Sequence, residues 1–298
     1  MLRKLLLPLL LVIGIAAAQA VPEVQDHLLV TTDWLAEHLD NPDVVILHVA
    51  EDNENYSKGH IPGAYLVTWK DIVTTRAGIP NELPPVEELV KWVRKAGIDK
   101  DRRIVIYDET GGIAAARTFL TLDYLGLGDQ AALLDGHLIK WKAENRKLST
   151  QTTEPTSSSF EPELNQDMII NLQAMQEKIR NMGEDTAVTT CIIDARSEED
   201  YSGEKENQRL PRTGHIPGAT NIHWMKNIES EENPVLKPVE ELRKMYSFPS
   251  DAEIITYCTT GRQASHDYFV ARYLGYQPKL YDGSFIEWSQ ADETEVEK

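Results

Sequence analysis

Cysteine is scarce in this chain of 298 residues, which contains only Cys191 and Cys258. Two cysteines are too few for a small scaffold held together by several disulfides. They leave open a single disulfide, although the two lie in very different local sequences. Cys191 stands among Thr and Ile residues, where a small buried side chain is expected. Cys258 needs a separate explanation.

Positive charge is also in short supply. Lys and Arg number 30 against 48 Asp and Glu, which gives a net charge of −18. Such a balance argues against nucleic acid or an anionic membrane as a partner. An anionic substrate would have to be attracted locally. The sequence also lacks metal-ligand spacings of His and Cys and glycine-rich phosphate loops, so neither a metal nor another cofactor is expected.

Long apolar runs are missing after the first twenty residues. Residues 1–20 combine a basic start, an apolar stretch and the small-residue site Ala18-Gln19-Ala20. This order predicts a secretory signal peptide, and an uncleaved membrane anchor is the alternative. We therefore expect an exported, periplasmic protein that begins at Val21 and has no stable membrane association. A mature chain of this length suits two domains.

The sequence contains an internal repeat. Three pairs of segments match in the same order: GHIPGA at 59–64 and 214–219, IVIYDETGG at 104–112 with IITYCTTGR at 254–262, and LDGHLIKW at 134–141 with YDGSFIEW at 281–288. Similar offsets between matching segments indicate two copies of one domain.

A segment rich in Ser, Thr and Pro, residues 149–162, separates the two copies. Its composition predicts a solvated linker. The first domain is therefore expected at residues 21–148 and the second at residues 163–298.

Strands and helices are expected to alternate within each copy. In the second copy, residues 188–196 and 253–258 are short, continuous apolar runs, typical of strands that are covered on both faces. Residues 237–247 and 262–275 are typical of helices, and the last ends at a glycine suited to a helix terminus. The fold class is therefore α/β, with a mostly parallel sheet flanked by helices in each domain.

Cys258 follows one of these predicted strands and precedes Thr-Thr-Gly-Arg-Gln. In open α/β sheets, chemistry collects at the carboxyl ends of the strands. The loop can curl so that its backbone N–H groups point at the sulfur, with Gly261 adopting a positive φ. A free thiol has a pKa of about 8.5, so these N–H groups, the helix dipole and Arg262 would have to lower the pKa of Cys258. An inert buried cysteine is the alternative.

The doubled GHIPGA, the order strand, cysteine, loop, helix, and the closing YDGSFIEW together resemble the tandem-domain rhodanese family of thiosulfate and 3-mercaptopyruvate sulfurtransferases. The resemblance covers essentially all of the chain after residue 20. It implies that Cys258 takes a sulfane sulfur from a small-molecule donor as a persulfide and passes it to a thiophilic acceptor, cyanide or a thiol. Asp108 replaces the cysteine in the first copy, which is therefore expected to be catalytically silent. The loop implied to hold the donor consists of Thr259, Thr260, Gly261, Arg262 and Gln263.

The segment Asp194-Ala195-Arg196 matches an Asp-x-Arg motif of that family. The match implies that Arg196 faces the cleft, where its guanidinium could bind the anionic end of a donor. Arg209 and Arg212 are weaker candidates and are expected to be solvated. The alternative for Arg196 is a salt bridge to one of three nearby carboxylates, Glu198, Glu199 or Asp200.

The resemblance leaves the donor open. Thiosulfate enzymes of the family tend to have basic residues directly after the cysteine, and mercaptopyruvate enzymes tend to have small ones, whereas this chain has Thr259 and Thr260. Arg262 favours thiosulfate. The alternatives are 3-mercaptopyruvate and a non-catalytic sulfur-carrier or binding module, with a protein as a further candidate acceptor. A phosphatase is disfavoured because Ala264, six positions after the cysteine, replaces the arginine that such loops require.

Four other residues are expected to be structural. His60 and His215 lie within the two copies of GHIPGA, in the silent and the active half alike, so a role in a turn is expected. Trp141 and Trp288 occupy matching positions and are expected to anchor a helix to the core.

Overall fold

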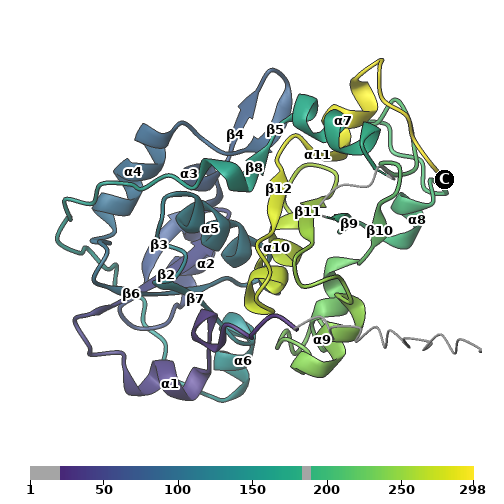
Figure 1. Cartoon of the computed structure of the whole chain (residues 1–298). Coiled ribbons are helices and arrows are strands. Elements are labelled where there is room, and N and C mark those ends of the chain that lie inside the picture. Colours follow the sequence, from purple (N-terminus) through teal and green to yellow (C-terminus); the bar gives the residue numbers. More distant parts are fainter. Residues whose placement is uncertain (1–20, 183–188) are drawn as a thin grey trace, which may run out of the picture.

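The computed structural model describes residues 21–182 and 189–298 (Figure 1). The predicted signal peptide, residues 1–20, lies outside the described residues. Within the two described ranges, no helix has the length and apolar character that crossing a bilayer requires.

Each half of the chain forms a five-stranded sheet in which every neighbouring pair of strands is parallel. The strand order is β1-β7-β6-β2-β3 in the first half and, read from the matching edge, β8-β12-β11-β9-β10 in the second. The repeat seen in the sequence is therefore also a repeat of topology. The strands are β1 (Leu29–Val30), β2 (Val44–Ala50), β3 (Tyr65–Thr68), β6 (Arg103–Tyr107), β7 (Ala131–Leu134), β8 (Ile169–Ile170), β9 (Thr190–Asp194), β10 (Thr220–Asn221), β11 (Glu253–Tyr257) and β12 (Lys279–Tyr281).

Helices connect these strands, and a short antiparallel hairpin adds to the first half. The hairpin pairs β4 (Thr74–Arg76) with β5 (Ile79–Glu82). The helices are α1 (Thr32–Glu37), α2 (Asn53–Lys58), α3 (Trp69–Ile72), α4 (Val86–Lys95), α5 (Ile113–Tyr124), α6 (His137–Ala143), α7 (Leu172–Arg180), α8 (Glu198–Tyr201), α9 (Val239–Met245), α10 (Ala264–Tyr273) and α11 (Ser284–Gln290).

Both faces of each sheet are buried. Along β11, Ile254 packs into one hydrophobic cluster and Ile255 into another, and Ile193 and Ile192 of β9 divide in the same way. Because alternate residues of a strand point to opposite faces, a strand covered on both sides needs apolar residues throughout. This confirms the α/β class with mostly parallel sheets.

The predicted elements of the second half are present but shorter. The run at 253–258 forms β11, and that at 188–196 forms β9, whose predicted first residue lies outside the described part. The stretches at 237–247 and 262–275 form α9 and α10. Gly275, just beyond α10, has a φ of 95°, which glycine adopts without strain.

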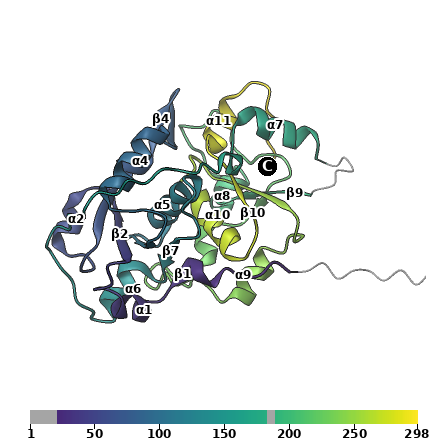
Figure 2. The ribbon, with the colours of Figure 1, turned by 60° about the vertical axis from the view of Figure 1, so that its left-hand side comes forward.

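The two halves share one continuous hydrophobic cluster. Helix α5 of the first half lies beside α10 of the second, as both views show (Figures 1 and 2). Phe119 of α5 meets Phe269 of α10 edge to face, with ring centroids 4.9 Å apart and both side chains fully buried. The interface between the domains is therefore part of the core.

Two matching hydrogen bonds also cross this interface. The N–H of Leu83 donates to Oδ2 of Asp282 at 2.7 Å, and the N–H of Leu236 donates to Oδ1 of Asp135 at 2.9 Å. Asp135 and Asp282 are the aspartates of the matching LDG and YDG segments. Each half thus supplies an equivalent acceptor to the other.

The connecting segment lies along the first domain instead of crossing open solvent. The N–H of Thr153 donates to Tyr56 Oη at 3.2 Å, and Arg94 Nε donates to the carbonyl of Phe160 at 2.8 Å. Phe160 is buried. The expected solvated linker is thus anchored by its one large apolar side chain.

Candidate active site

Cys258 lies at the carboxyl end of β11, where the chain turns toward α10. The N–H groups of Ala264, Thr260 and Gln263 act as hydrogen-bond donors to its sulfur. The residue is only 1% exposed, so almost none of it contacts solvent. Both Cys258 and Cys191 are free thiols, so the structure does not contain the disulfide that the sequence left open. Cys191 is only partly buried.

Burial raises the pKa of the Cys258 thiol above its ordinary value. The three N–H groups act in the opposite direction, and the nearby carboxylate of Asp194 adds to the rise. The expected lowering of this pKa is therefore wrong for the resting site. Desolvation outweighs the curled loop because the sulfur is fully enclosed.

The matching loop of the first half shows what such a loop binds. Asp108 is fully buried, and its carboxylate accepts four backbone hydrogen bonds of 2.8–3.0 Å. Its donors are the N–H groups of Thr110, Gly112, Ala114 and Ala115. Two of these positions, Thr110 and Ala114, match the donors Thr260 and Ala264 at the same offset as Asp108 and Cys258. Both copies of the loop are therefore built to hold an anion.

Arg196 is buried below the loop and paired with Asp194. Its Nε lies 2.9 Å from Asp194 Oδ1, and Nη2 donates to the carbonyl of Gly214 at 2.7 Å. The guanidinium also stacks on Phe285 with a separation of 4.0 Å. Burial alone would lower the pKa of Arg196, but the Asp194 carboxylate outweighs it and the pKa is raised. The guanidinium thus carries a permanent positive charge that acts on the Cys258 sulfur.

The salt-bridge alternative for Arg196 named the wrong carboxylates. The partner is Asp194, two positions earlier in the chain, and not one of the three acids that follow. Arg212 also departs from its expected solvation, because its Nη2 and Nε donate to the carbonyls of Trp288 and Ser289 at 2.9 Å, near the end of α11. Arg209 is exposed, as expected.

Arg262 leaves the loop and reaches the first domain. Its Nη2 pairs with Glu51 Oε1 at 2.8 Å, and its guanidinium lies 4.5 Å from the ring centre of Trp69. These side chains border a cavity of about 150 Å³ that is also lined by Glu109 and Thr110 of the Asp108 loop. Arg262 therefore contacts the first domain, and the lining of this cavity does not include Cys258.

The remaining loop residues are positioned by their neighbours. Thr260 Oγ1 accepts a hydrogen bond from Asn81 Nδ2 of the first domain at 2.9 Å. Gly261 has a φ of 79°, as predicted. The carbonyl of Thr259 accepts the N–H of Ile286 at 3.0 Å, and Gln263 stands directly before the first turn of α10.

Sequence reasoning missed the residues that the first domain supplies. Asn81 and Trp69 contact Thr260 and Arg262, and Arg117 of α5 lies against Gly261. One signal was available for Arg117, because it is a lone charged residue within the apolar run IAAARTFL. No local pattern marks Asn81 or Trp69, whose contacts depend on how the domains pack.

The two histidines and two tryptophans that were expected to be structural make structural contacts. His60 stacks on Tyr56 at 3.7 Å and His215 on Tyr201 at 3.8 Å, and each Nδ1 faces the carbonyl of the same tyrosine. Trp141 and Trp288 are buried. The Nε1 group of Trp141 donates to the carbonyl of Lys147, and that of Trp288 donates to the carbonyl of Glu295.

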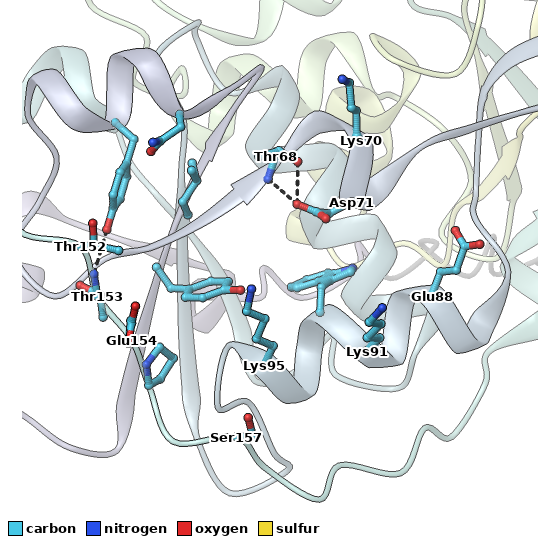
Figure 3. Close-up of a pocket in the computed structure, with 16 residues that line it drawn as sticks. Thr68, Lys70, Asp71, Glu88, Lys91, Lys95, Thr152, Thr153, Glu154 and Ser157 are labelled. Carbon is cyan, nitrogen blue, oxygen red and sulfur yellow. Dashed lines mark hydrogen bonds between the residues drawn. The ribbon is translucent and has the colours of Figure 1, made fainter.

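A larger cavity of about 930 Å³ lies elsewhere, between α4 and the connecting segment (Figure 3). Lys91 and Lys95 border it on one side and Thr152, Thr153 and Glu154 on another. Every residue that lines it belongs to the first half or the connector. It is therefore separate from the Cys258 loop.

Comparison with known proteins agrees with this geometry. A family model described as a rhodanese-like domain matches twice, at residues 31–144 and 175–291. The chain belongs to the rhodanese family. The two matches contain the two parallel sheets, apart from β1 and β8 at their edges.

Several rhodanese relatives resemble the whole chain. It is 34% identical to the sulfur carrier protein TtuD of Thermus thermophilus over 90% of this chain and 94% of that protein. It is 30% identical to a putative thiosulfate sulfurtransferase of Mycolicibacterium smegmatis, over 89% and 95% of the two chains. The solved structure of SseA from Escherichia coli, described as a 3-mercaptopyruvate sulfotransferase, matches with a TM-score of 0.73 at 26% identity, over 86% of this chain and 98% of that one.

Proposed function

We propose that this rhodanese is a sulfurtransferase that moves the outer sulfur of thiosulfate to a thiophilic acceptor through Cys258. The observation that supports the proposal most directly is the pair of matching loops. The silent loop holds the carboxylate of Asp108 with four N–H groups, and the same loop in the second half surrounds the sulfur of Cys258. A persulfide anion on Cys258 would occupy the equivalent position.

The proposed reaction has two steps. Cys258 first releases its proton to solvent, and the thiolate attacks the outer sulfur of thiosulfate. A new sulfur–sulfur bond forms, the old one breaks, and sulfite leaves with the bonding electron pair. Cyanide or a thiolate then attacks the outer sulfur of the persulfide. The product, thiocyanate or a new persulfide, departs, and the Cys258 thiolate is regenerated. No oxidant, reductant or cofactor is consumed.

Thiosulfate is the preferred donor in this proposal because Arg262 can be released to it. The ion pair of Arg262 with Glu51 is partly exposed, and such pairs contribute only about 0–1 kcal/mol. An anionic donor can therefore compete with Glu51 for the guanidinium. Arg196, by contrast, is held by Asp194, so we assign its charge to the sulfur and not to direct contact with the donor.

Replacing the sulfur tests the proposed reaction. Cys258→Ser should abolish transfer of sulfur from thiosulfate to cyanide, because the hydroxyl cannot carry a sulfane sulfur. Asp108→Ala is the control and should keep nearly full activity, since the first loop takes no part in the chemistry. A steady-state assay of thiocyanate formation measures both. Activity retained by the serine variant would exclude the proposed mechanism.

A sulfur-carrier role is the second candidate, and it is favoured by the likeness to the sulfur carrier protein of Thermus thermophilus. In either role, thiosulfate should add about 32 Da, the mass of one sulfur atom, to Cys258. A carrier would stop after one such addition, with a protein as acceptor, whereas an enzyme would turn over with cyanide or a thiol. Running the same assay with 3-mercaptopyruvate would decide the donor.

We also propose that the protein is exported to the periplasm after removal of residues 1–20. The proposal rests on the basic start, the apolar stretch and the small residues before Val21. Mass spectrometry of protein expressed with its full sequence in a bacterial host should find Val21 as the first residue. Protein that stays in the membrane fraction with Met1 intact would support the anchor instead.

A further inference from the structure

Arg117 is the charged residue that the proposed chemistry leaves unexplained. It lies on α5 of the silent domain, and its side chain is fully buried. Its Nη2 donates to Asp282 Oδ1 at 3.0 Å and to the carbonyl of Asn81 at 2.7 Å. Nε and Nη1 have no partner among the described residues. Because a buried donor without a partner is costly, this placement needs a reason other than stability.

The guanidinium of Arg117 lies against the loop that follows Cys258. A Cβ placed on Gly261 would lie 3.3 Å from Arg117 Nη1, and 3.2 and 3.4 Å from the carbonyl oxygen and Oδ1 of Asp282. Arg117 and Asp282 therefore form the surface against which Gly261 takes its positive φ. Asn81, which accepts from Arg117 through its carbonyl, donates to Thr260 through its side chain. One group thus fixes two successive residues of the loop.

The same site in the other half has no cation. Asp267 occupies the position on α10 that matches Arg117 on α5, at the offset of 150 that relates Cys258 to Asp108. It is bound to Asn227 and Tyr246. The silent loop binds the side chain of Asp108, whereas the active loop must create and hold an anion on sulfur. Of these two matching helix positions, the one beside the Cys258 loop carries the cation.

We propose that Arg117 is a positioning residue by which the silent domain holds the catalytic loop, so that the loop N–H groups point at the Cys258 sulfur. The proposal rests on the proposed sulfur transfer through Cys258. Arg117 acts through Thr260 and Gly261 and does not contact the donor. Its loss should therefore lower the rate of sulfur transfer more than the affinity for thiosulfate.

Three variants test this role in the full chain. Arg117→Ala should lower kcat by about tenfold to a hundredfold, as misplacing catalytic groups commonly does, with KM for thiosulfate changed by less than about threefold. Arg117→Lys should give an intermediate kcat, because its single ammonium can replace Nη2, which bonds both Asn81 and Asp282, but not Nη1, which lies against Gly261. Arg272→Ala is the control, since it breaks another ion pair between the domains, the partly buried pair with Asp123 at 2.9 Å, away from the loop.

The control separates positioning from general stability. Arg272→Ala should lower the urea midpoint and leave kcat unchanged. If Arg117→Ala behaved like Arg272→Ala, or raised KM with kcat unchanged, the proposal would be overturned. If Arg117→Ala does not fold, Arg117→Lys decides, because an unchanged kcat would exclude the role and a lowered kcat would support it. Failure of the sulfur-transfer proposal is distinct, since it appears as activity retained by Cys258→Ser.

Discussion

At the scale of single residues, the interior contains two neighbours on α10 with opposite perturbations. Burial lowers the pKa of His266 to about 3, with His137 adding to the fall and Asp108 opposing it. Burial raises the pKa of Asp267 well above its ordinary value, against the hydrogen bonds from Asn227 and Tyr246. In the folded protein, burial therefore favours the neutral form of both side chains, the unprotonated histidine and the protonated aspartate.

These two groups should cancel in the pH dependence of stability. Near pH 5, between the ordinary pKa values of aspartate (about 3.9) and histidine (about 6.5), the unfolded chain carries one proton on His266 and almost none on Asp267, and the folded chain is expected to carry the reverse. His266→Gln removes the proton of the unfolded chain, so stability should rise as the pH falls. Asp267→Asn removes the proton of the folded chain, so stability should fall as the pH falls. Each slope should approach about 1.4 kcal/mol per pH unit.

Urea unfolding at pH 4, 5 and 6 measures these slopes. The isosteric asparagine keeps the oxygen that accepts from Asn227 and Tyr246, so its effect at pH 6 should be modest. If the free energy of unfolding changed with pH in the same way in both variants, His266 and Asp267 would not have the opposite protonation states expected in the folded protein.

At the scale of elements, the sequence was sufficient for the strand, loop and helix around Cys258. Short-range sequence determines the geometry here. The apolar run before the cysteine forms a strand, Gly261 adopts the positive φ of the loop, and the glycine after α10 adopts the positive φ at the end of that helix. The partners of the arginines could not be predicted in this way. Arg262 meets Glu51, which is 211 positions earlier in the chain, and a pairing across that separation depends on the packing of α5 against α10. The pKa of Cys258 depends on burial, which the loop sequence alone does not reveal.

The arrangement of each half was predictable because the same sequence segments occur twice in the chain. Matching segments at similar offsets predicted two copies of one domain, and the two sheets have the same strand order. Comparing the sequences of the two halves could not predict the contacts that differ between them. Arg117 and Asp267 stand at equivalent positions but bind unrelated partners.

At the scale of the whole molecule, the shared core predicts that the two domains unfold together. Phe269 is fully buried against Phe119 of the other half, within a cluster that includes residues of both. Phe269→Ala should lower the free energy of unfolding by about 3–5 kcal/mol, the usual cost of deleting a buried aromatic ring. Urea unfolding should remain a single transition at a lower midpoint.

Hydrogen exchange followed by mass spectrometry can check this coupling. Amides of β6 in the first sheet and of β11 in the second should lose protection to the same extent in Phe269→Ala. Protection lost from β11 alone, with β6 unchanged, would mean that the domains are independent folding units despite their contact.

The contacts between the halves are also reciprocal. Phe119 and Phe269 are counterparts in the repeat and touch each other, and the bond from Leu83 to Asp282 is mirrored by the bond from Leu236 to Asp135. Such reciprocity, with one residue meeting its own copy, is the signature of an isologous dimer. The two halves are therefore related like the subunits of such a dimer, and each half covers the other with the same part of its surface. A substitution at this contact changes one residue of a reciprocal pair, so its counterpart in the other half is the natural second site for a double-mutant cycle.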